Sequence, residues 1–361
     1  MKIDKDIRSG HPADYWEIRE DGRFQCNVCP RYCQIRPGQR GFCYVRAAHE
    51  EGMVLTTYGR SSGFCADPIE KKPLNHFYPG TAVLSFGTAG CNLGCKFCQN
   101  WDISKSRDMD TLSSHAPPEA IAKAALDAGC QSVAFTYNDP VIFAEYAMDT
   151  AKACKEAGLN TVVVSAGYMT AAVRRDFFAN ADAANIDLKA FTDGFYRKIC
   201  FGRLDPVLET LCYLKNETSV WLEVTTLIIP GENDSDGEIG QMCRWMVAHL
   251  GKDVPLHFTA FHPDFRLKDR EHTPPAALRR ARQIALGEGL RYVYVGNVHD
   301  SDASSTYCHQ CGGLVIERDW YRLGAYNLDS QGQCQTCQTP LPGRFEARKG
   351  QWQSQRFRVH I

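Results

Sequence analysis

The sequence has no excess of charge of either sign and no long apolar run. Its 41 Lys and Arg residues stand against 42 Asp and Glu residues, for a formal net charge of −1. Nucleic-acid-binding proteins usually carry a basic field, so nucleic acid is not expected as the main partner. No stretch approaches the roughly 18 apolar residues of a membrane span, and the first residues show no apolar region of a signal peptide. We therefore expect a cytoplasmic protein without a membrane partner.

Cysteine, in contrast, is abundant, with 17 residues. In a reducing compartment, clustered cysteines are more often metal ligands than disulfide partners. Six are scattered in apolar surroundings and are expected to be small buried hydrophobic residues: Cys65, Cys130, Cys154, Cys200, Cys212 and Cys243. The other eleven form three groups: Cys26, Cys29, Cys33 and Cys43; Cys91, Cys95 and Cys98; and Cys308, Cys311, Cys334 and Cys337.

Residues 81–299 alternate short β-rich runs with segments of helical apolar spacing. This alternation is typical of βα units around a parallel sheet. We predict an α/β fold, a partial (β/α)6-type TIM-like barrel, with its active site at the carboxyl ends of the strands. A cysteine-rich arm (residues 1–80) precedes this core, and a zinc-ribbon-like appendage with a polar tail (residues 300–361) follows it. The expected strands are residues 82–86, 132–137, 161–165, 183–188, 220–229, 256–261 and 292–295, and the expected helices include residues 118–129, 141–158 and 236–250.

The central cysteine group follows the first expected strand directly. Cys91, Cys95 and Cys98 have the spacing C-x3-C-x2-C. Three thiolates can hold three irons of a [4Fe-4S] cube and leave the fourth iron open to a substrate or cofactor. A structural zinc site needs four ligands, one more than this group offers.

This motif, with Phe97 immediately before its third cysteine, resembles the signature of the radical S-adenosylmethionine (SAM) superfamily. The resemblance implies a [4Fe-4S] cluster and S-adenosyl-L-methionine as cofactors. It implies that a reductant such as flavodoxin or ferredoxin supplies an electron, that SAM is cleaved to a 5′-deoxyadenosyl radical, and that this radical abstracts hydrogen from the substrate. The cofactor carries the difficult chemistry, and the protein positions it.

The same resemblance suggests roles for residues at the other strand ends. Asn138 and Asp139 stand where the superfamily often holds the SAM amino group, and Ser165 is a candidate for the ribose. Asp187 and Lys189 resemble an Asp-x-Lys motif near SAM and are the catalytic candidates, with a purely structural ion pair as the alternative.

Apolar and polar residues of the later strands complete this expected site. Ile229 and Phe261 could pack on adenine or be simple core, and Asn297 could close the pocket. His257 and His262 could donate hydrogen bonds or protons, with a structural role as the alternative.

Longer motifs resemble one branch of the superfamily. Residues 67–74, 76–80 and 99–104 look like those of the radical SAM member of the AmmeMemoRadiSam group, which is similar to pyruvate formate-lyase-activating enzymes. The resemblance implies a protein or peptide substrate, activation of a glycyl-radical enzyme, and AMMECR-like and Memo-like partner proteins. Two departures count against an activase: no ferredoxin-like insertion follows Cys98, and Glu223, Thr225 and Thr226 occupy a strand where many activases carry Arg. The alternatives are radical modification of a small metabolite, and an iron-sulfur electron-transfer or scaffold protein without SAM turnover.

The two outer cysteine groups each have enough ligands for a closed metal site. Cys26, Cys29, Cys33 and Cys43 would suit an auxiliary iron-sulfur cluster or zinc, or would be reduced thiols packed in the arm. Two C-x2-C pairs, Cys308 with Cys311 and Cys334 with Cys337, are typical of a zinc ribbon or a rubredoxin-like site, so zinc is expected there and iron is the alternative.

Overall fold

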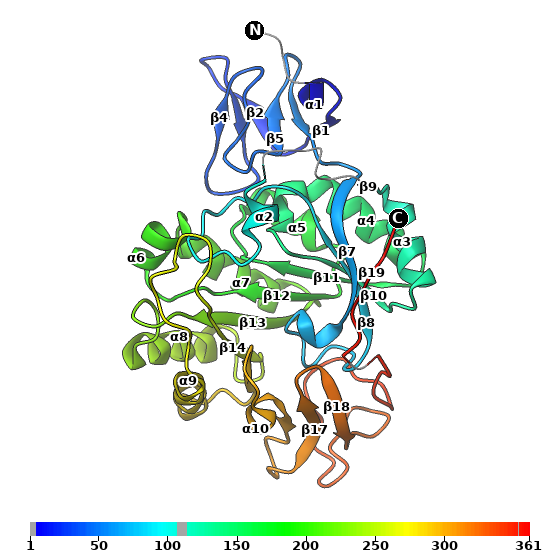
Figure 1. Cartoon of the computed structure of the whole chain (residues 1–361), viewed down its shortest axis with the longest axis vertical. Coiled ribbons are helices and arrows are strands. Elements are labelled where there is room, and N and C mark those ends of the chain that lie inside the picture. Colours follow the sequence, from blue (N-terminus) through cyan, green and yellow to red (C-terminus); the bar gives the residue numbers. More distant parts are fainter. Residues whose placement is uncertain (1–4, 107–113, 353) are drawn as a thin grey trace.

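The computed structural model describes residues 5–106, 114–352 and 354–361. Its centre is a ten-stranded sheet in which each neighbouring pair from β8 to β15 is parallel (Figure 1). The sheet is open, with β15 at one end of the strand order and β19 at the other. The predicted α/β fold of a partial barrel is thus confirmed. The parallel strands are β8 (Ala82–Gly87), β10 (Ser132–Phe135), β11 (Asn160–Ser165), β12 (Ala183–Asp187), β13 (Trp221–Ile228), β14 (Leu256–Ala260) and β15 (Val293–Gly296).

The expected strands lie where the sequence placed them, but β12, β13 and β14 each end one residue early and β10 ends two residues early. Residues 136–137 were expected to continue β10, and this was wrong. Tyr137 has a left-handed backbone (φ 70°), and the Asn138 amide donates to the Thr136 carbonyl at 2.9 Å. The chain therefore turns at the strand end, and Asn138 and Asp139 enter the mouth of the barrel.

Helices connect the parallel strands. The predicted helix at residues 141–158 begins one residue earlier, as a 3₁₀ turn (η3, Pro140–Phe143), because the Asp139 side chain accepts from the Val141 amide. The sequence predicts helices that end at Gly129 and Gly158. These glycines follow α3 and α4 and have positive φ, as is common at helix C-termini. The helices are α3 (Pro118–Asp127), α4 (Ala144–Glu156), α5 (Ala171–Phe178), α6 (Asp193–Phe195), α7 (Asp205–Glu217), α8 (Asp236–His249) and α9 (Pro275–Gly287), with a π-helical turn η4 (Tyr196–Cys200) after α6.

The N-terminal arm contributes to the main sheet. β7 (Arg60–Pro68) pairs antiparallel with β8, and β19 (Phe357–Arg358), near the C-terminus, pairs antiparallel with β7. The division of the chain at residues 80 and 299 stays a prediction. Smaller elements of the arm and of the loop after the cysteine triplet are α1 (Lys5–Arg8), β1 (His11–Pro12), β2 (Trp16–Ile18), β3 (Phe24–Cys26), β4 (Gln34–Ile35), β5 (Arg46–Ala48), β6 (Met53–Leu55), η1 (Ile69–Lys71), α2 (Trp101–Ser104) and β9 (Ser114–His115).

The C-terminal cysteines lie in the turns next to a separate small sheet. This sheet has the order β16 (Thr306–Tyr307), β17 (Leu314–Asp319) and β18 (Arg322–Tyr326), and it follows the short helix α10 (Ser301–Ser304). In Figure 1 it lies at the opposite end of the molecule from the first strands of the arm, β1 to β5. Val315, Ile316 and Leu328 form its own buried apolar cluster.

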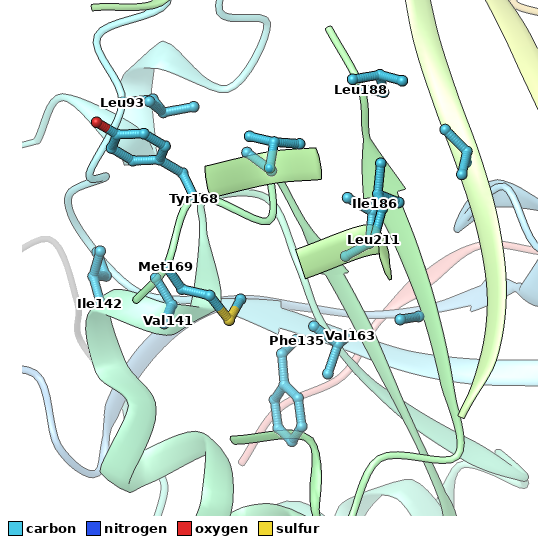
Figure 2. Close-up of a cluster of buried hydrophobic side chains, with 14 of the residues drawn as sticks. Leu93, Phe135, Val141, Ile142, Val163, Tyr168, Met169, Ile186, Leu188 and Leu211 are labelled. Atoms are coloured by element: carbon cyan, nitrogen blue, oxygen red, sulfur yellow. The ribbon is translucent and has the colours of Figure 1, made fainter. Parts of the chain in front are cut away.

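The core packs side chains of the sheet against the helices and reaches the cysteine triplet. Figure 2 shows Phe135, Val163 and Ile186 of neighbouring strands, with Leu93 and Tyr168 at the edge of the cluster. Leu93 lies inside the triplet and is buried, and burying a Leu side chain contributes roughly 1.5–3 kcal/mol. The core therefore fixes the position of the triplet loop. No helix among the described residues has the length and apolar character needed to cross a membrane.

Candidate active site

The cysteine triplet forms a loop that is fixed on both sides. Within it, the Gly94 and Lys96 amides donate to the carbonyls of Cys200 and Ile199 at 2.9 and 3.0 Å. The Asn92 side chain donates to the Tyr168 carbonyl at 2.8 Å, and the Lys105 ammonium donates to the Leu93 carbonyl at 2.7 Å. The backbone of residues 91–98 is therefore fixed by the barrel independently of any bound group.

All three thiols of the triplet line one cavity of about 320 Å³. The cavity lies at the carboxyl ends of the parallel strands, where such folds place their active sites. The structure brings most of the predicted site residues to this cavity: Phe97, Asn138, Asp139, Ser165, Asp187, Lys189 and Asn297 line it together with Cys91, Cys95 and Cys98.

Asn138 and Asp139 have different contacts. The Asn138 amide group donates to the Gly90 carbonyl at 2.8 Å and accepts from the Thr88 amide at 3.2 Å, so it shapes the loop before the triplet. Asp139 accepts from the Ser165 hydroxyl at 2.9 Å and from the Ala166 amide at 3.2 Å. Burial raises the pKa of Asp139 to about 6, against the lowering effect of these hydrogen bonds. Asp139 is thus a buried carboxylate that could receive an ammonium group.

Asp187 and Lys189 form an ion pair inside the cavity. The Lys189 ammonium lies 2.8 Å from an Asp187 carboxylate oxygen and 5.8 Å from the centre of the Phe97 ring. Burial alone would lower the pKa of Lys189, but the Asp187 charge and the nearby thiols outweigh burial and hold this pKa above its usual value. Lys189 therefore presents a positive charge beside the triplet.

The structure does not bring Ile229 and Phe261 to the cavity. Both side chains are buried in the core, and the backbone has left the strands at these points. The cavity is lined instead by Leu227 and Thr259, which lie on β13 and β14. His262 is exposed and is not among the lining residues.

Cys200 was expected to be a scattered buried hydrophobic residue, but it lies against the triplet. Its thiol hydrogen-bonds with Cys95, and this contact, opposed by burial, lowers the pKa of Cys95 to about 7. Cys200 ends the π-helical turn η4, and such turns frequently occur at functional sites. Nothing in the spacing of the sequence connects Cys200 with Cys95, which lies more than a hundred residues earlier.

We expect the Cys200→Ala variant to retain an iron-sulfur cluster with a more negative reduction potential. Hydrogen bonds to cluster sulfurs are one of the factors that set the potential, and loss of a donor makes the thiolate more electron-rich. A redox titration followed by electron paramagnetic resonance (EPR) measures the shift, with Cys154→Ala as a buried control. An unchanged potential would show that the contact is only structural.

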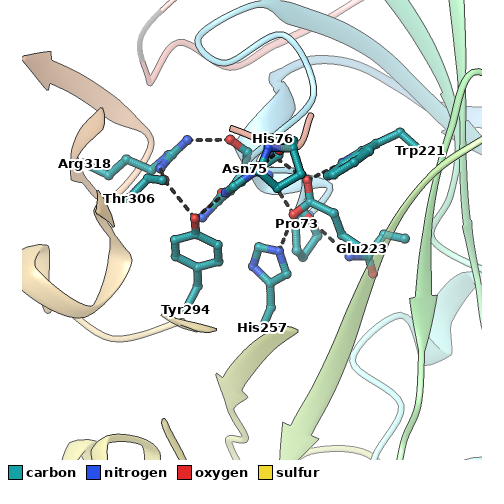
Figure 3. A network of polar contacts seen from close by, with 11 residues as sticks. Pro73, Asn75, His76, Trp221, Glu223, His257, Tyr294, Thr306 and Arg318 are labelled. Carbon is teal, nitrogen blue, oxygen red and sulfur yellow. Dashed lines mark hydrogen bonds and ion pairs between the residues drawn. The ribbon is translucent and has the colours of Figure 1, made fainter. Parts of the chain in front are cut away.

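His257 belongs to a buried polar network around Glu223, beyond the cavity (Figure 3). The Glu223 carboxylate accepts from the Asn75 and His76 amides at 3.0 and 2.7 Å. It also lies 3.0 Å from the Trp221 indole nitrogen and 2.6 Å from the His257 ring. Burial raises the pKa of Glu223, but these donors outweigh burial and lower it overall. Glu223 thus connects the arm to β13 and β14.

The network continues into the C-terminal sheet. Arg318 donates to the Asn75 carbonyl and to the Thr306 hydroxyl, both at 2.7 Å. Tyr294 lies within 2.8 Å of Thr306 and 2.6 Å of the His76 ring. Burial lowers the pKa of His76 to about 4, which keeps this ring neutral. Sequence reasoning missed the network, although a glutamate in the middle of a buried strand was a signal for one.

We expect Glu223→Ala to destabilise the protein by about 3–5 kcal/mol, because it leaves several buried donors without a partner. Urea unfolding under anaerobic conditions measures the change. Glu209→Ala is the matched control, since Glu209 is 64% exposed and pairs with Arg174, and we expect an effect within about 0.5 kcal/mol there. Equal stability of the two variants would contradict the role of the network.

The C-terminal cysteines have the geometry of a single-ion site. The sulfurs of Cys308 and Cys337 lie 3.6 Å apart, those of Cys311 and Cys334 lie 3.8 Å apart, and all four lie within 4.8 Å of one another. A tetrahedral ion with metal–sulfur bonds of about 2.3 Å separates its ligands by about 3.8 Å. The four thiols therefore fit one metal ion such as zinc or iron.

A second, wider cavity of about 830 Å³ adjoins the first at Cys91 and Ser104. It is open to solvent and includes Phe42 and Cys43 of the arm. Phe42, Trp101 and Phe201 are between 44% and 47% exposed, and the Trp101 ring stacks on Phe265 with centroids 5.8 Å apart. This aromatic groove, defined by Phe42, Trp101, Phe201 and Phe265, offers more contact area than the cavity at the strand ends.

The comparison with known proteins agrees with this site. Residues 86–243 match the model of the radical SAM superfamily, and the match includes the triplet, the Asp139 carboxylate and the Asp187–Lys189 pair. The chain belongs to the radical SAM superfamily and is an enzyme of the radical SAM class. Membership implies a [4Fe-4S] cluster and SAM, and the three convergent thiols beside a polar cavity fit both.

Three relatives show what the chain is similar to. The uncharacterized protein MJ0808 of Methanocaldococcus jannaschii is 39% identical over 326 residues, which cover 90% of this chain and 97% of that protein. The pyruvate formate-lyase 1-activating enzyme of Escherichia coli (strain K12) is 24% identical over 181 residues, 46% of this chain and 70% of the enzyme. A solved domain of the pyruvate-formate lyase-activating enzyme from Bacteroides vulgatus aligns with a TM-score of 0.41 and 17% identity, over 46% of this chain and 98% of the domain. The narrower assignment to the AmmeMemoRadiSam group stays a prediction.

Proposed function

We propose that the chain cleaves SAM reductively at the triplet and that the resulting radical abstracts hydrogen from a protein or peptide substrate. The observation that carries the proposal is the single cavity shared by three thiols, a buried carboxylate and a largely covered ammonium group. When bound, the cluster and SAM supply the electron transfer and the radical. The chain's residues position the cluster and SAM, place charged groups beside them and exclude water from the cavity.

The residues of the cavity have different roles, which follow from their charges. Cys91, Cys95 and Cys98 would hold the cluster, and Asp139 is the acceptor available for the SAM amino group. Lys189 offers a cation for a carboxylate or hydroxyl oxygen, and Asp187 holds that cation in place at 2.8 Å. Ser165 lines the cavity but hydrogen-bonds with Asp139, so we assign it the positioning of that carboxylate as well as a contact with the ribose.

The aromatic groove supports a macromolecular substrate. Its exposed rings are residues of the kind enriched at protein interfaces, and its volume of about 830 Å³ exceeds the 320 Å³ of the cavity at the strand ends. The groove meets the cavity at Cys91, so a peptide lying in it could extend a residue toward the radical. The activating enzymes among the relatives are named for a protein that they activate, and activation of a glycyl-radical enzyme is one form of this function.

One experiment separates the candidate functions. The anaerobically reconstituted protein is mixed with dithionite, SAM and a perdeuterated cell extract divided by size into macromolecules and metabolites. Deuterium in 5′-deoxyadenosine from the macromolecular fraction alone supports the proposal, and deuterium from the metabolite fraction alone would replace it with modification of a small molecule. Absence of 5′-deoxyadenosine in every sample would favour an iron-sulfur protein without SAM turnover.

The C-terminal site and the partners complete the proposal. We assign the C-terminal cysteines to zinc, because their spacing suits one tetrahedral ion and because the small sheet has little core of its own. A flavodoxin or ferredoxin would supply the electron, and AMMECR-like and Memo-like proteins are the proposed associates.

We expect removal of this metal to unfold the C-terminal sheet locally while the barrel persists. Metal binding is part of the folding free energy of small cysteine sites. Hydrogen exchange of the Cys308→Ala/Cys311→Ala variant should show lost protection in residues 306–341 and retained protection in the parallel strands. Protection equal to that of the wild type throughout would argue against a metal-dependent segment.

A further inference from the structure

The four N-terminal cysteines come together in the folded arm. Cys26 ends β3, and Cys29, Cys33 and Cys43 lie in the following turns. All four side chains line one small enclosed cavity together with Arg31, Arg46, Asn92 and Ile142. Four thiols of one segment thus converge on one point, as the ligands of a metal centre do.

The spacing of these thiols differs from that of a single-ion site. Within the described ranges of the chain, the C-terminal cysteines are the only group of three or more His, Cys, Asp or Glu side chains whose ligand atoms all lie within 4.8 Å of one another. The cluster-binding triplet does not meet this limit, and neither do the N-terminal cysteines. A cube that binds each thiolate at a different iron spreads its ligands more widely than one ion does. The N-terminal group, like the triplet, is therefore wider than the zinc-type site.

The charges around the cavity also favour an anionic metal centre. Arg46 is buried and lines the same cavity as Cys26, and its charge is shared with the Glu145 carboxylate. Arg31 lines the same cavity. Glu145 compensates the charge of Arg46, whereas Arg31 donates to backbone carbonyls, so thiolates around a cluster would supply negative charge close to Arg31.

The arm contacts the triplet loop directly at this point. The Arg31 guanidinium donates to the Asn92 carbonyl, and Asn92 follows Cys91 and also lines the N-terminal cavity. A Cβ atom on Gly90 would lie only 2.0 Å from the Cys43 carbonyl oxygen, so the two backbones touch. These contacts bring the N-terminal cysteine group next to the triplet loop.

We propose that Cys26, Cys29, Cys33 and Cys43 hold a second [4Fe-4S] cluster that passes electrons to the cluster at the triplet. One electron leaves a low-potential donor of the flavodoxin or ferredoxin class and reduces the second cluster from the 2+ to the 1+ state. The electron then moves to the triplet cluster, and the second cluster returns to 2+. No bond changes in this step, because every iron of the second cluster already has a cysteine ligand. The electron-transfer part rests on the proposed function, but the metal assignment does not.

Iron analysis and Mössbauer spectra of the full-length protein test the metal assignment. After anaerobic reconstitution with ⁵⁷Fe and sulfide, we expect wild type to hold two [4Fe-4S] clusters, about eight irons. The Cys91→Ala/Cys95→Ala/Cys98→Ala and Cys29→Ala/Cys33→Ala variants should each hold one cluster. The Cys308→Ala/Cys311→Ala variant is the matched control and should keep both. A triplet variant that has no cluster but binds zinc at the N-terminal group would overturn the assignment.

Two electron donors test the transfer. We expect the Cys29→Ala/Cys33→Ala variant to lose SAM cleavage driven by reduced flavodoxin and to keep cleavage driven by dithionite, which can reduce the triplet cluster directly. Because this variant still carries the triplet cluster, its Mössbauer signal shows that the chain is folded. Undiminished cleavage with flavodoxin would exclude the transfer. A wild-type protein with two clusters that forms no 5′-deoxyadenosine would refute the proposed function alone.

Discussion

The Cys95→Ala variant is expected to form no 5′-deoxyadenosine and to lose the iron-sulfur cluster of the triplet. Cys95 is the middle ligand of the three and is buried. Three thiolates are the minimum that leaves a single iron open, so loss of one exposes a second iron and removes a covalent contact of the cluster. Chromatography of the products after anaerobic reduction with dithionite in the presence of SAM measures this outcome.

A matched control is another buried cysteine. Cys130 lies 4% exposed between α3 and β10, and it lines none of the cavities described above. Cys130→Ala should cleave SAM at the wild-type rate. Equal 5′-deoxyadenosine formation by Cys95→Ala and by wild type would contradict the assignment of the triplet as the cleavage site.

Replacing Lys189 by Met is expected to lower kcat/KM for SAM cleavage by at least about 30-fold. The substitution keeps most of the side-chain volume but removes the ammonium group that lies 2.8 Å from Asp187. Lys189 is 13% and Asp187 37% exposed, so we take roughly 2 kcal/mol, the lower end of the cost of truncating one partner of a hydrogen-bonded charge pair, and each 1.4 kcal/mol is about a tenfold change. Rates measured over a range of SAM concentrations separate the effect on KM from that on kcat.

Two variants separate a functional pair from a structural one. Lys198 is exposed on the neighbouring π-helical turn, so Lys198→Met should leave the rate unchanged. Lys189→Arg retains the charge and should recover part of the activity. If Lys189→Met lowers the free energy of unfolding without changing either kinetic constant, the pair is a structural ion pair, as one interpretation of the sequence allowed.

The activase interpretation can be reconsidered with the position of Glu223. The family resemblance implies that many activases have an arginine on this strand near SAM. Here the strand has Glu223, whose carboxylate belongs to the network that joins the arm and the C-terminal sheet to the barrel. Thr225 and Leu227, on the same strand, line the cavity instead. The first part of β13 therefore makes structural contacts through Glu223, and its carboxyl end lines the active-site cavity through Thr225 and Leu227.

The sequence by itself determined the features that depend on short spacing. The triplet and the two C-x2-C pairs are local motifs, because a bound metal restricts how far apart its ligands can lie along a turn. The alternation of βα units was also local, since the apolar period changes from strand to helix within a few residues. These patterns predicted the barrel and the placement of Cys91, Cys95 and Cys98 at its carboxyl end.

Only the tertiary structure decided which distant residues meet. The contact of Cys200 with Cys95, the approach of Cys43 to Gly90 and the network around Glu223 join segments from about fifty to two hundred and fifty residues apart. Leu227 and Thr259 line the cavity in place of Ile229 and Phe261 because the backbone leaves each strand before the later residue. The physical reason is that packing of helices against the sheet fixes these contacts. The local periodicity of the sequence does not indicate at which residue a strand ends or which loop covers the strand end.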